Sequence, residues 1–249
     1  MVNIIYILWL RQVKRYWRSK PRMIGSLGQP ILFLVALGFG FGPIYQCAGG
    51  GNYIEFLAPG IIAMSIIFTA MFTGIEVIYD RQFGFLKETL VAPVPRWAIM
   101  FGRTLGGATV AALQGIVVFI ISLFIGFRPE IAAQSLLALV FMVLIAIFFT
   151  AFGTAIASRL EDMQAFPLII NFLIMPLFFL SGALFPIENV SGALHTITSF
   201  NPLSYGVDGI RGALTNQIHF GFTSDFTFLI IVTFLVLAIG TYLFSKVEV

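Results

Sequence analysis

Ser181, His195 and His219 are the residues whose types could support nucleophilic catalysis, because a histidine can take the proton of a serine hydroxyl. Both histidines fall in the same apolar but interrupted segment, 186–225, where single histidines are more often solvated or hydrogen-bonded than catalytic. The histidines and carboxylates do not have the spacing of a metal site. The residue pattern therefore does not favour catalysis by this chain.

The sequence also lacks the usual means of using ATP or an ion gradient. A phosphate-binding loop ends in Gly-Lys, and no lysine of this chain follows a glycine. Ion-coupled transporters place ionisable groups near the bilayer centre, but the cores of the long apolar stretches contain no Asp, Glu, Lys or Arg. If the chain takes part in active transport, we expect the energy to come from another protein.

Composition predicts a membrane protein. Of the 249 residues, 59% are hydrophobic and 10% are charged, against about 25% charged residues in soluble domains. A helix needs about 20 apolar residues to cross the hydrocarbon core, and open strands would leave backbone groups unpaired in lipid. We expect one all-α polytopic domain over residues 1–249, with six transmembrane helices at 23–45, 56–78, 104–127, 131–157, 165–187 and 226–245.

Small and amide residues predict where these spans meet. Overlapping small-xxx-small registers, which allow close approach of helices, are formed by Gly102, Gly106, Gly107, Ala111 and Gly115. Amide side chains within spans are expected to form hydrogen bonds between helices, and the main ones are Gln114 and Asn171.

The distribution of basic residues predicts orientation. Twelve of the 14 Lys and Arg residues fall on one side of the predicted spans, mainly before the first span and in the loop after the second. Because basic loops are retained in the cytoplasm, both termini are expected there, in the inner or plasma membrane of a cell. The net charge of +3 then reflects orientation. The basic segments are not interleaved with stacking aromatics on a soluble surface, so no nucleic-acid partner is expected.

Two segments at the basic side have patterns of their own. Residues 1–22 predict an amphipathic helix in the membrane surface, broken by Pro21, either as an anchor or with a mechanical role. The charged stretch 79–103 is expected to lie in water as a hairpin, with an amphipathic stripe suited to docking, although an ordinary solvated loop fits the same residues. Glu76 lies close to lipid and should pair with Arg81 or with the basic face of residues 1–22.

Segment 186–225 is too apolar for a free loop and too interrupted for a span. Residues 190–200 and 205–214 predict two short helices separated by Asn201 and Pro202. Irregular backbone at membrane depth requires cover by protein or water. We therefore expect a re-entrant helical hairpin at the outer face, where it could cap a path through the membrane.

Three stretches together resemble the type-two permeases of ATP-binding-cassette (ABC) exporters. Residues 90–97 (LVAPVPRW) resemble the cytoplasmic motif of that family. Residues 201–205 (NPLSY), followed by Asp208 and Arg211, are similar to its outer motif, and residues 180–183 (LSGA) also fit. The resemblance covers essentially the whole chain, and the motifs stand in the family's order.

The resemblance implies a six-span half-transporter that dimerises, with a second copy or with a related chain, and binds two separate ABC ATPase subunits in the cytoplasm. Residues 81–90 would form the coupling helix against the ATPase, and the outer hairpin would help to close the exit. The residues matching the coupling role are Arg81, Phe83, Leu86, Lys87, Glu88, Leu90, Pro93 and Pro95. Those matching the outer gate are Pro202, Tyr205 and Arg211.

The function implied is ATP-driven export by alternating access. The charge-free spans and 28 Phe favour a lipophilic or amphiphilic substrate, such as a drug-like molecule in multidrug export or a lipid, taken from the cytoplasm or the inner leaflet. A permease for a lipid-linked polysaccharide or glycolipid is the alternative, and an ion-coupled transporter or a structural scaffold has less support. The chain is expected to be no enzyme and to hold no metal or cofactor, because ATP and Mg²⁺ would bind the partner subunit.

Overall fold

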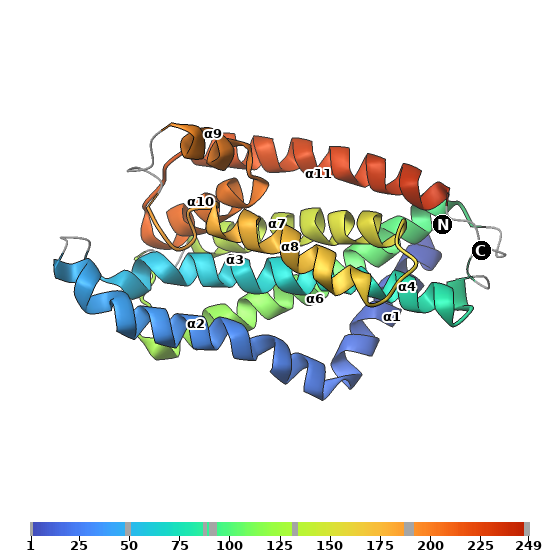
Figure 1. Ribbon diagram of the computed structural model, residues 1–249, viewed down its shortest axis with the longest axis horizontal. Helices are drawn as coiled ribbons and strands as arrows, with labels where there is room; N and C mark the ends of the chain where they lie inside the picture. The colour runs from blue at the N-terminus through green and yellow to red at the C-terminus, as the bar shows by residue number, and fades with distance from the viewer. Residues whose placement is uncertain are drawn as a thin grey trace.

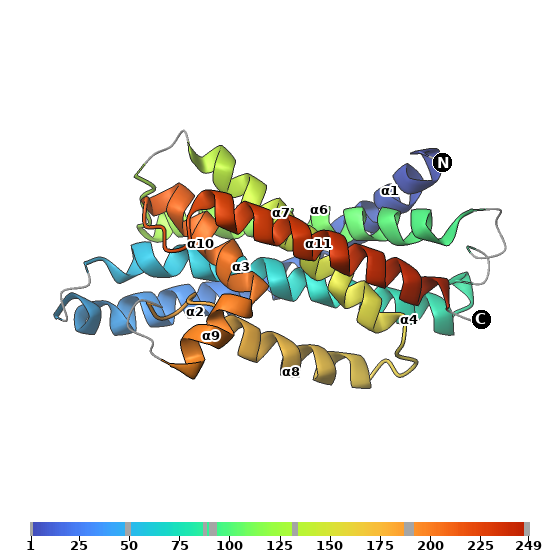
Figure 2. The ribbon, with the colours of Figure 1, turned by 90° about the horizontal axis from the view of Figure 1, so that it is seen from above.

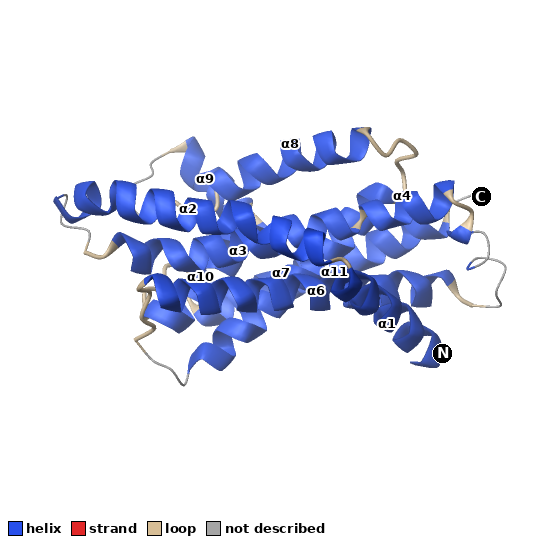
Figure 3. Cartoon of the chain, turned by 90° about the horizontal axis from the view of Figure 1, so that it is seen from below, coloured by secondary structure: helices blue, strands red, loops and turns tan. Residues whose placement is uncertain are grey.

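A computed structural model describes residues 2–47, 51–86, 89, 94–130, 134–186 and 192–246, without the side chains of 193–195, and these residues contain helices but no strand (Figure 3). The helices are α1 (Val2–Arg18), α2 (Lys20–Cys47), α3 (Tyr53–Thr73), α4 (Ile75–Gln82), α6 (Arg96–Ile125), α7 (Ser135–Ala157), α8 (Ala165–Phe179), α9 (Ala193–Phe200), α10 (Pro202–Thr215) and α11 (Phe222–Ser245). This agrees with the predicted all-α class.

The helices lie along one long axis, which gives the molecule two distinct ends (Figures 1 and 2). When α8 is counted with the long helices, successive helices run in alternating directions along this axis. The helices α1 and α4, the start of α6 and the end of α11 lie at one end, which we call the basic end. The short helices α9 and α10 lie at the opposite end, which we call the hairpin end.

Among the described residues, five helical segments are long and apolar enough to cross a membrane, so the chain is a multi-pass membrane protein. They are α2, α3 continued by α4, α6, α7 and α11. The predicted fifth span is shorter than expected, because α8 ends at Phe179 after 15 residues. Its length of about 22 Å falls short of a hydrocarbon core of about 30 Å. Figures 2 and 3 show α8 on the outside of the bundle, where its main packing partner is α3.

The centre of the bundle is α3, which is buried by α2, α6, α7 and α10. Its crossing with α7 brings two backbones together at glycines. A Cβ added to Gly153 would lie 2.6 Å from the carbonyl oxygen of Met71, and one added to Gly74 would lie 2.5 Å from that of Gly153. Only glycine permits this distance between helices, because backbone atoms cannot rotate out of the way.

The amphipathic helix predicted at the N-terminus is present as α1, and it packs mainly against α6. The predicted close approach of helices at Gly102 and Gly106 is confirmed here, because a Cβ on Gly106 would lie 2.6 Å from the Cβ of Gln12. The chain leaves the helix at Ser19, and Pro21 lies in the first turn of α2 rather than at the break. Proline is tolerated in a first turn because the backbone N–H groups there lack helical partners.

Candidate functional site

Two buried carboxylates, Glu76 and Asp80, lie one turn apart on α4 at the basic end. Arg11 of α1 donates to Asp80 at 2.9 Å, and Arg22 of α2 donates to Glu76 at 2.7 Å. The Arg103 side chain of α6 is 3% exposed and binds the second oxygen of Asp80. Arg15 lies 3.6 Å from Glu76 and 3.7 Å from Asp80. We call these six residues the charge cluster: Arg11, Arg15, Arg22, Glu76, Asp80 and Arg103.

The charge cluster confirms one prediction and corrects another. Glu76 pairs with Arg15 of the basic face, which was one of the two alternatives, and its nearest partner is Arg22, also within residues 1–22, rather than Arg81. The stretch 79–103 is also not wholly solvated, because Asp80 and Arg103 are buried and α6 already begins at Arg96. The four-residue spacing of Glu76 and Asp80 places both on one helical face, a signal that could have predicted their shared site.

Because its two carboxylates are buried, the charge cluster links α4 firmly to α1, α2 and α6. A charge removed from water is costly unless it is paired, so α1, α2 and α6 must each keep an arginine against α4. Four arginines face two carboxylates, which leaves an excess of two positive charges at this end. A displacement of α4 would therefore move α1 and α6 with it or break buried ion pairs.

A second polar contact holds α1 on α6 deeper in the bundle. The Tyr16 hydroxyl donates to the side-chain oxygen of Gln114 at 2.6 Å, which confirms Gln114 as a helix-to-helix hydrogen-bonding residue. Burial raises the pKa of the Tyr16 phenol, so the hydroxyl keeps its proton and remains a donor. Asn171, in contrast, is exposed on α8.

The predicted coupling residues begin where α4 ends. Arg81 donates to the carbonyl oxygens of Ser158 at 2.8 Å and Leu160 at 3.4 Å, and Gln82 donates to that of Glu161 at 2.9 Å. These bonds join the end of α4 to the loop between α7 and α8. The coupling residue Pro95 precedes the first residue of α6. Lys87, Glu88, Leu90 and Pro93 lie outside the described residues.

The predicted amphipathic stripe is interrupted, because the chain turns at Gly84 with a φ of +79°. A left-handed backbone of this kind is easy for glycine and ends the regular helical spacing. Phe83 is consequently 67% exposed, whereas Leu86 is fully buried in the core. Phe85 is also exposed. Among the described residues of this segment, the exposed apolar side chains are therefore Phe83 and Phe85.

The two short helices predicted at 190–200 and 205–214 are confirmed as α9 and α10, separated at Asn201. Pro202 occupies the first position of α10, and the Asn201 side chain caps it by accepting from Leu203 N at 3.0 Å. The Asn201 amide also donates to Leu177 O of α8 at 2.6 Å. Asn201 was not among the predicted site residues, although an asparagine before proline is a common helix start.

The predicted outer residues Tyr205 and Arg211 link α10 to its neighbours. The Tyr205 hydroxyl donates to Ser199 O of α9 at 2.8 Å, and its ring stacks on Phe228 of α11. Arg211 is buried and donates to Gly182 O at 2.9 Å and Phe56 O at 3.3 Å, with its guanidinium 4.0 Å from the Phe56 ring centre. Arg211 thus joins α10 to the start of α3 and to the segment after α8.

Asp208 is a further linking residue that was not among the predicted site residues. Its carboxylate accepts from the backbone N–H groups of His219 at 2.9 Å and Phe220 at 2.8 Å. It therefore fixes the loop that leads into α11. Asp208 lies three residues before Arg211 in the outer motif, and this position could have predicted its importance.

Ser181 and His219 line one small cavity at the hairpin end, of ≈ 40 Å³, whereas the His195 side chain lies outside the description. A cavity of this size holds a few water molecules at most. The Ser181 hydroxyl donates to Phe178 O at 2.7 Å, so its proton is directed at a backbone carbonyl and not at a base. This geometry does not favour a nucleophilic serine.

We expect Arg211→Lys to destabilise the hairpin end. Lysine keeps the charge but cannot reproduce the guanidinium contacts with two carbonyls and the Phe56 ring. Loss of hydrogen bonds to a charged group should lower the free energy of unfolding by about 1.5–3 kcal/mol. Thermal unfolding of the purified protein in detergent measures the effect, with Arg128→Lys, an exposed arginine at the same end, as the control. Equal unfolding temperatures for the two variants would contradict the assigned role.

Comparison with known proteins identifies the family. A sequence profile of the ABC-2 type transporter family matches residues 3–215. The chain is 30% identical over 222 residues to ycf38 of Porphyra purpurea, provisionally named a transport permease, and the match covers 87% of this chain and 75% of that protein. It is 29% identical over 197 residues to Nodulation protein J of Rhizobium leguminosarum bv. viciae, with 78% and 75% covered. This chain therefore belongs to the ABC-2 type transporter family, as one of its permeases.

Proposed function

We propose that this permease is the membrane subunit of an exporter driven by ATP hydrolysis in a separate ABC ATPase. Permeases of this family pair with such ATPase subunits. The observation that carries the proposal for this chain is the position of Phe83 and Phe85. Both are exposed at the basic end, on a turn that directly follows the buried carboxylates of α4. A partner that pulls on this turn acts on the charge cluster, and through it on α1, α2 and α6.

The basic end is the cytoplasmic end in this proposal. Twelve of the 14 basic residues belong to segments on that side, which the positive-inside rule assigns to the cytoplasm. Both termini are then cytoplasmic, and α8 with the residues that follow it supplies the fifth of six crossings. Because α7 and α11 both run toward the basic end, the return of the chain through α8 between them supports an even number of crossings.

The hairpin end acts as the outer gate. Pro202 begins α10, and Tyr205 and Arg211 hold this helix against α3, α9 and α11 through backbone carbonyls and ring contacts. In alternating access, nucleotide binding in the ATPase must change the free-energy gap between inward-open and outward-open states. The buried contacts of Arg211 are ones that an opening of the hairpin would have to break.

The functional unit is a dimer of permeases with two ATPases. Many apolar side chains of α2 and α8 remain exposed in the single chain, including Leu32, Phe39, Leu168 and Phe172. A second copy is the simplest partner for part of this surface, and lipid covers the rest. A related permease could take the same place in a heterodimer.

The substrate is a lipophilic or amphiphilic molecule, either drug-like or a lipid, taken from the cytoplasm or the inner leaflet. The apolar spans support this class. A lipid-linked polysaccharide or glycolipid is the alternative cargo.

We expect Phe83→Ala to reduce ATPase binding without destabilising the permease. The side chain is exposed, so its loss leaves no cavity, but an exposed aromatic in a partner interface often carries much of the binding energy. Co-purification of the ATPase should fall about tenfold, and ATP-dependent transport into inside-out vesicles should fall with it. Phe124→Ala is the matched control, because Phe124 is an exposed phenylalanine near the hairpin end of α6. Undiminished co-purification for Phe83→Ala would count against this docking surface.

A further inference from the structure

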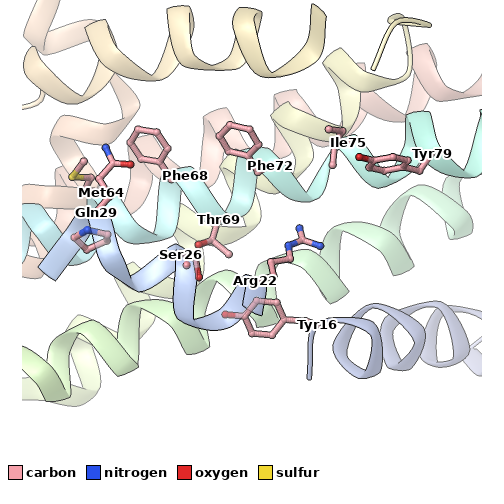
Figure 4. A pocket seen from close by; sticks show the side chains of 12 residues that line it. Tyr16, Arg22, Ser26, Gln29, Met64, Phe68, Thr69, Phe72, Ile75 and Tyr79 are labelled. Atoms are coloured by element: carbon pink, nitrogen blue, oxygen red, sulfur yellow. The ribbon is translucent and has the colours of Figure 1, made fainter. Parts of the chain in front are cut away.

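A cavity of ≈ 500 Å³ lies between the first half of α2 and the facing side of α3 and α4 (Figure 4). Neither the charge cluster nor the proposed gate accounts for it. Arg22, Phe68 and Phe72 line it and are only partly buried, so it can be reached from outside the bundle. Its volume lies in the range of about 300–1,000 Å³ that is usual for small-molecule sites.

The lining changes character along the cavity. Arg22, Tyr16 and Tyr79 lie at the end toward the charge cluster, whereas Gln29, Met64 and Phe68 lie further into the span. From Arg22 to Pro30 the rise along α2 is about 12 Å, and from Met64 to Tyr79 it is about 22 Å along α3 and α4. The two helices run in opposite directions, so both have their polar lining at the basic end. The basic side chain thus lies at one end, and most of the lining further in is apolar, with Gln29 and Thr69 as polar exceptions.

The polar end favours negative charge. Figure 4 shows Arg22 reaching from α2 toward α3, and one of its nitrogens donates to Glu76. A guanidinium has five N–H donors, so this bond leaves others for a ligand. The charge cluster, of which Arg22 is a member, has two positive charges in excess, and an anion would reduce this excess. Tyr79 adds a hydroxyl group at the same end, whereas the hydroxyls of Tyr16 and Ser26 donate to Gln114 and to Met23 O.

We propose that this cavity binds a drug-sized amphiphile with an anionic headgroup, held at Arg22 with its apolar chain toward Met64 and Phe68. The orientation matches that of an amphiphile in the inner leaflet if the basic end is cytoplasmic. The volume suits one headgroup and part of one chain. The binding itself does not depend on transport. Only the role of this ligand as cargo rests on the proposed export function.

Direct binding to the permease without its ATPase tests the proposal. Radiolabelled dodecyl phosphate is titrated onto the permease in nanodiscs of zwitterionic lipid, and unlabelled dodecyl maltoside and inorganic phosphate are used as competitors. We expect saturable binding of dodecyl phosphate, with at least about tenfold weaker competition by each of the other two. If dodecyl maltoside competed equally well, binding would not require an anionic headgroup. If inorganic phosphate competed equally well, binding would not require an apolar chain. Either result overturns the proposal.

Matched variants locate the site. Arg22→Gln should weaken binding about tenfold or more, while Arg22→Lys, which keeps the charge next to Glu76, should stay within about threefold. Lys20→Gln removes the same charge from an exposed residue of the same helix that does not line the cavity, and it should leave binding unchanged. Phe72→Trp should weaken binding by filling the cavity. If Arg22→Gln and Lys20→Gln lowered the affinity for dodecyl phosphate equally, the effect would come from surface charge alone and the proposed site would be wrong.

The two proposals fail separately. If dodecyl phosphate binds as described but the complex with the ATPase does not transport it, the binding site stands and its role as cargo is wrong. If ATP-driven transport of other amphiphiles occurs while dodecyl phosphate does not bind, the export function stands and the site is wrong.

Discussion

Asp80→Asn should yield little folded permease. The substitution removes the negative charge that pairs with Arg103, whose side chain is 3% exposed, and leaves that guanidinium buried without a counter-charge. Breaking a buried ion pair in this way costs about 3–5 kcal/mol. We expect a large fall in monodisperse protein after detergent extraction, measured by size-exclusion chromatography of a fluorescently tagged chain.

Two further variants make this prediction specific. Glu161→Gln removes an exposed carboxylate from the same end of the molecule and should leave the yield unchanged. Combining Asp80→Asn with Arg103→Met removes both buried charges and should recover much of the lost protein, because a pair replaced by uncharged groups leaves no uncompensated charge. A normal yield from Asp80→Asn alone would show that the pair is not needed for folding.

Gly153→Ala is expected to be nearly as damaging, although it adds a single methyl group. That group would lie 2.6 Å from Met71 O on the backbone of α3, so the two helices must move apart. Overpacking of a well-packed core costs about 1–3 kcal/mol, and the displacement would also alter the crossing of α3 and α7. Thermal unfolding in detergent should show a lowered midpoint, and ATP-dependent transport should fall with it.

Gly40→Ala is the matched control for Gly153→Ala. Gly40 is also a helical glycine in an apolar helix, but no atom lies within 4 Å of a Cβ built there. Alanine is favoured over glycine within a helix by about 0.5–1 kcal/mol, so this variant should unfold at the same temperature or slightly higher. If both variants behaved alike, the close crossing at Gly153 would not be what determines stability there.

The sequence was sufficient for the class of fold and for most helices because the apolar runs are long. The length of an apolar run indicates whether it can cross the membrane. The helices α2, α6, α7 and α11 each overlap a predicted span. The fifth span was predicted too long, since the apolar residues after Phe179 continue the composition but turn away from the helix. Composition does not distinguish an apolar turn covered by protein from a helical residue in lipid.

The partners of charged residues were harder to predict than the helices. Glu76 was expected to have a cation, but the choice of Arg22 depends on the bend at Ser19, which brings the first turn of α2 beside α4. Arg103 was assigned to a solvated loop because nothing local indicates that Asp80 meets it inside the bundle. At the hairpin end, the motif predicted Tyr205 and Arg211 as important, and the carbonyls they bind became apparent only in the folded chain.

The distance along the chain between the members of the charge cluster has a consequence for biogenesis. Arg11 is made first, but its partner Asp80 follows 69 residues later, and Arg103, which completes the site, is made later still. At ribosomal rates of about 5–20 residues per second, α1 exists for several seconds before Asp80 and α6 have been synthesised. The tryptophans and arginines of α1 allow it to lie among the lipid headgroups during this time. We therefore expect α1 to pack into the bundle only when the third span, α6, is inserted.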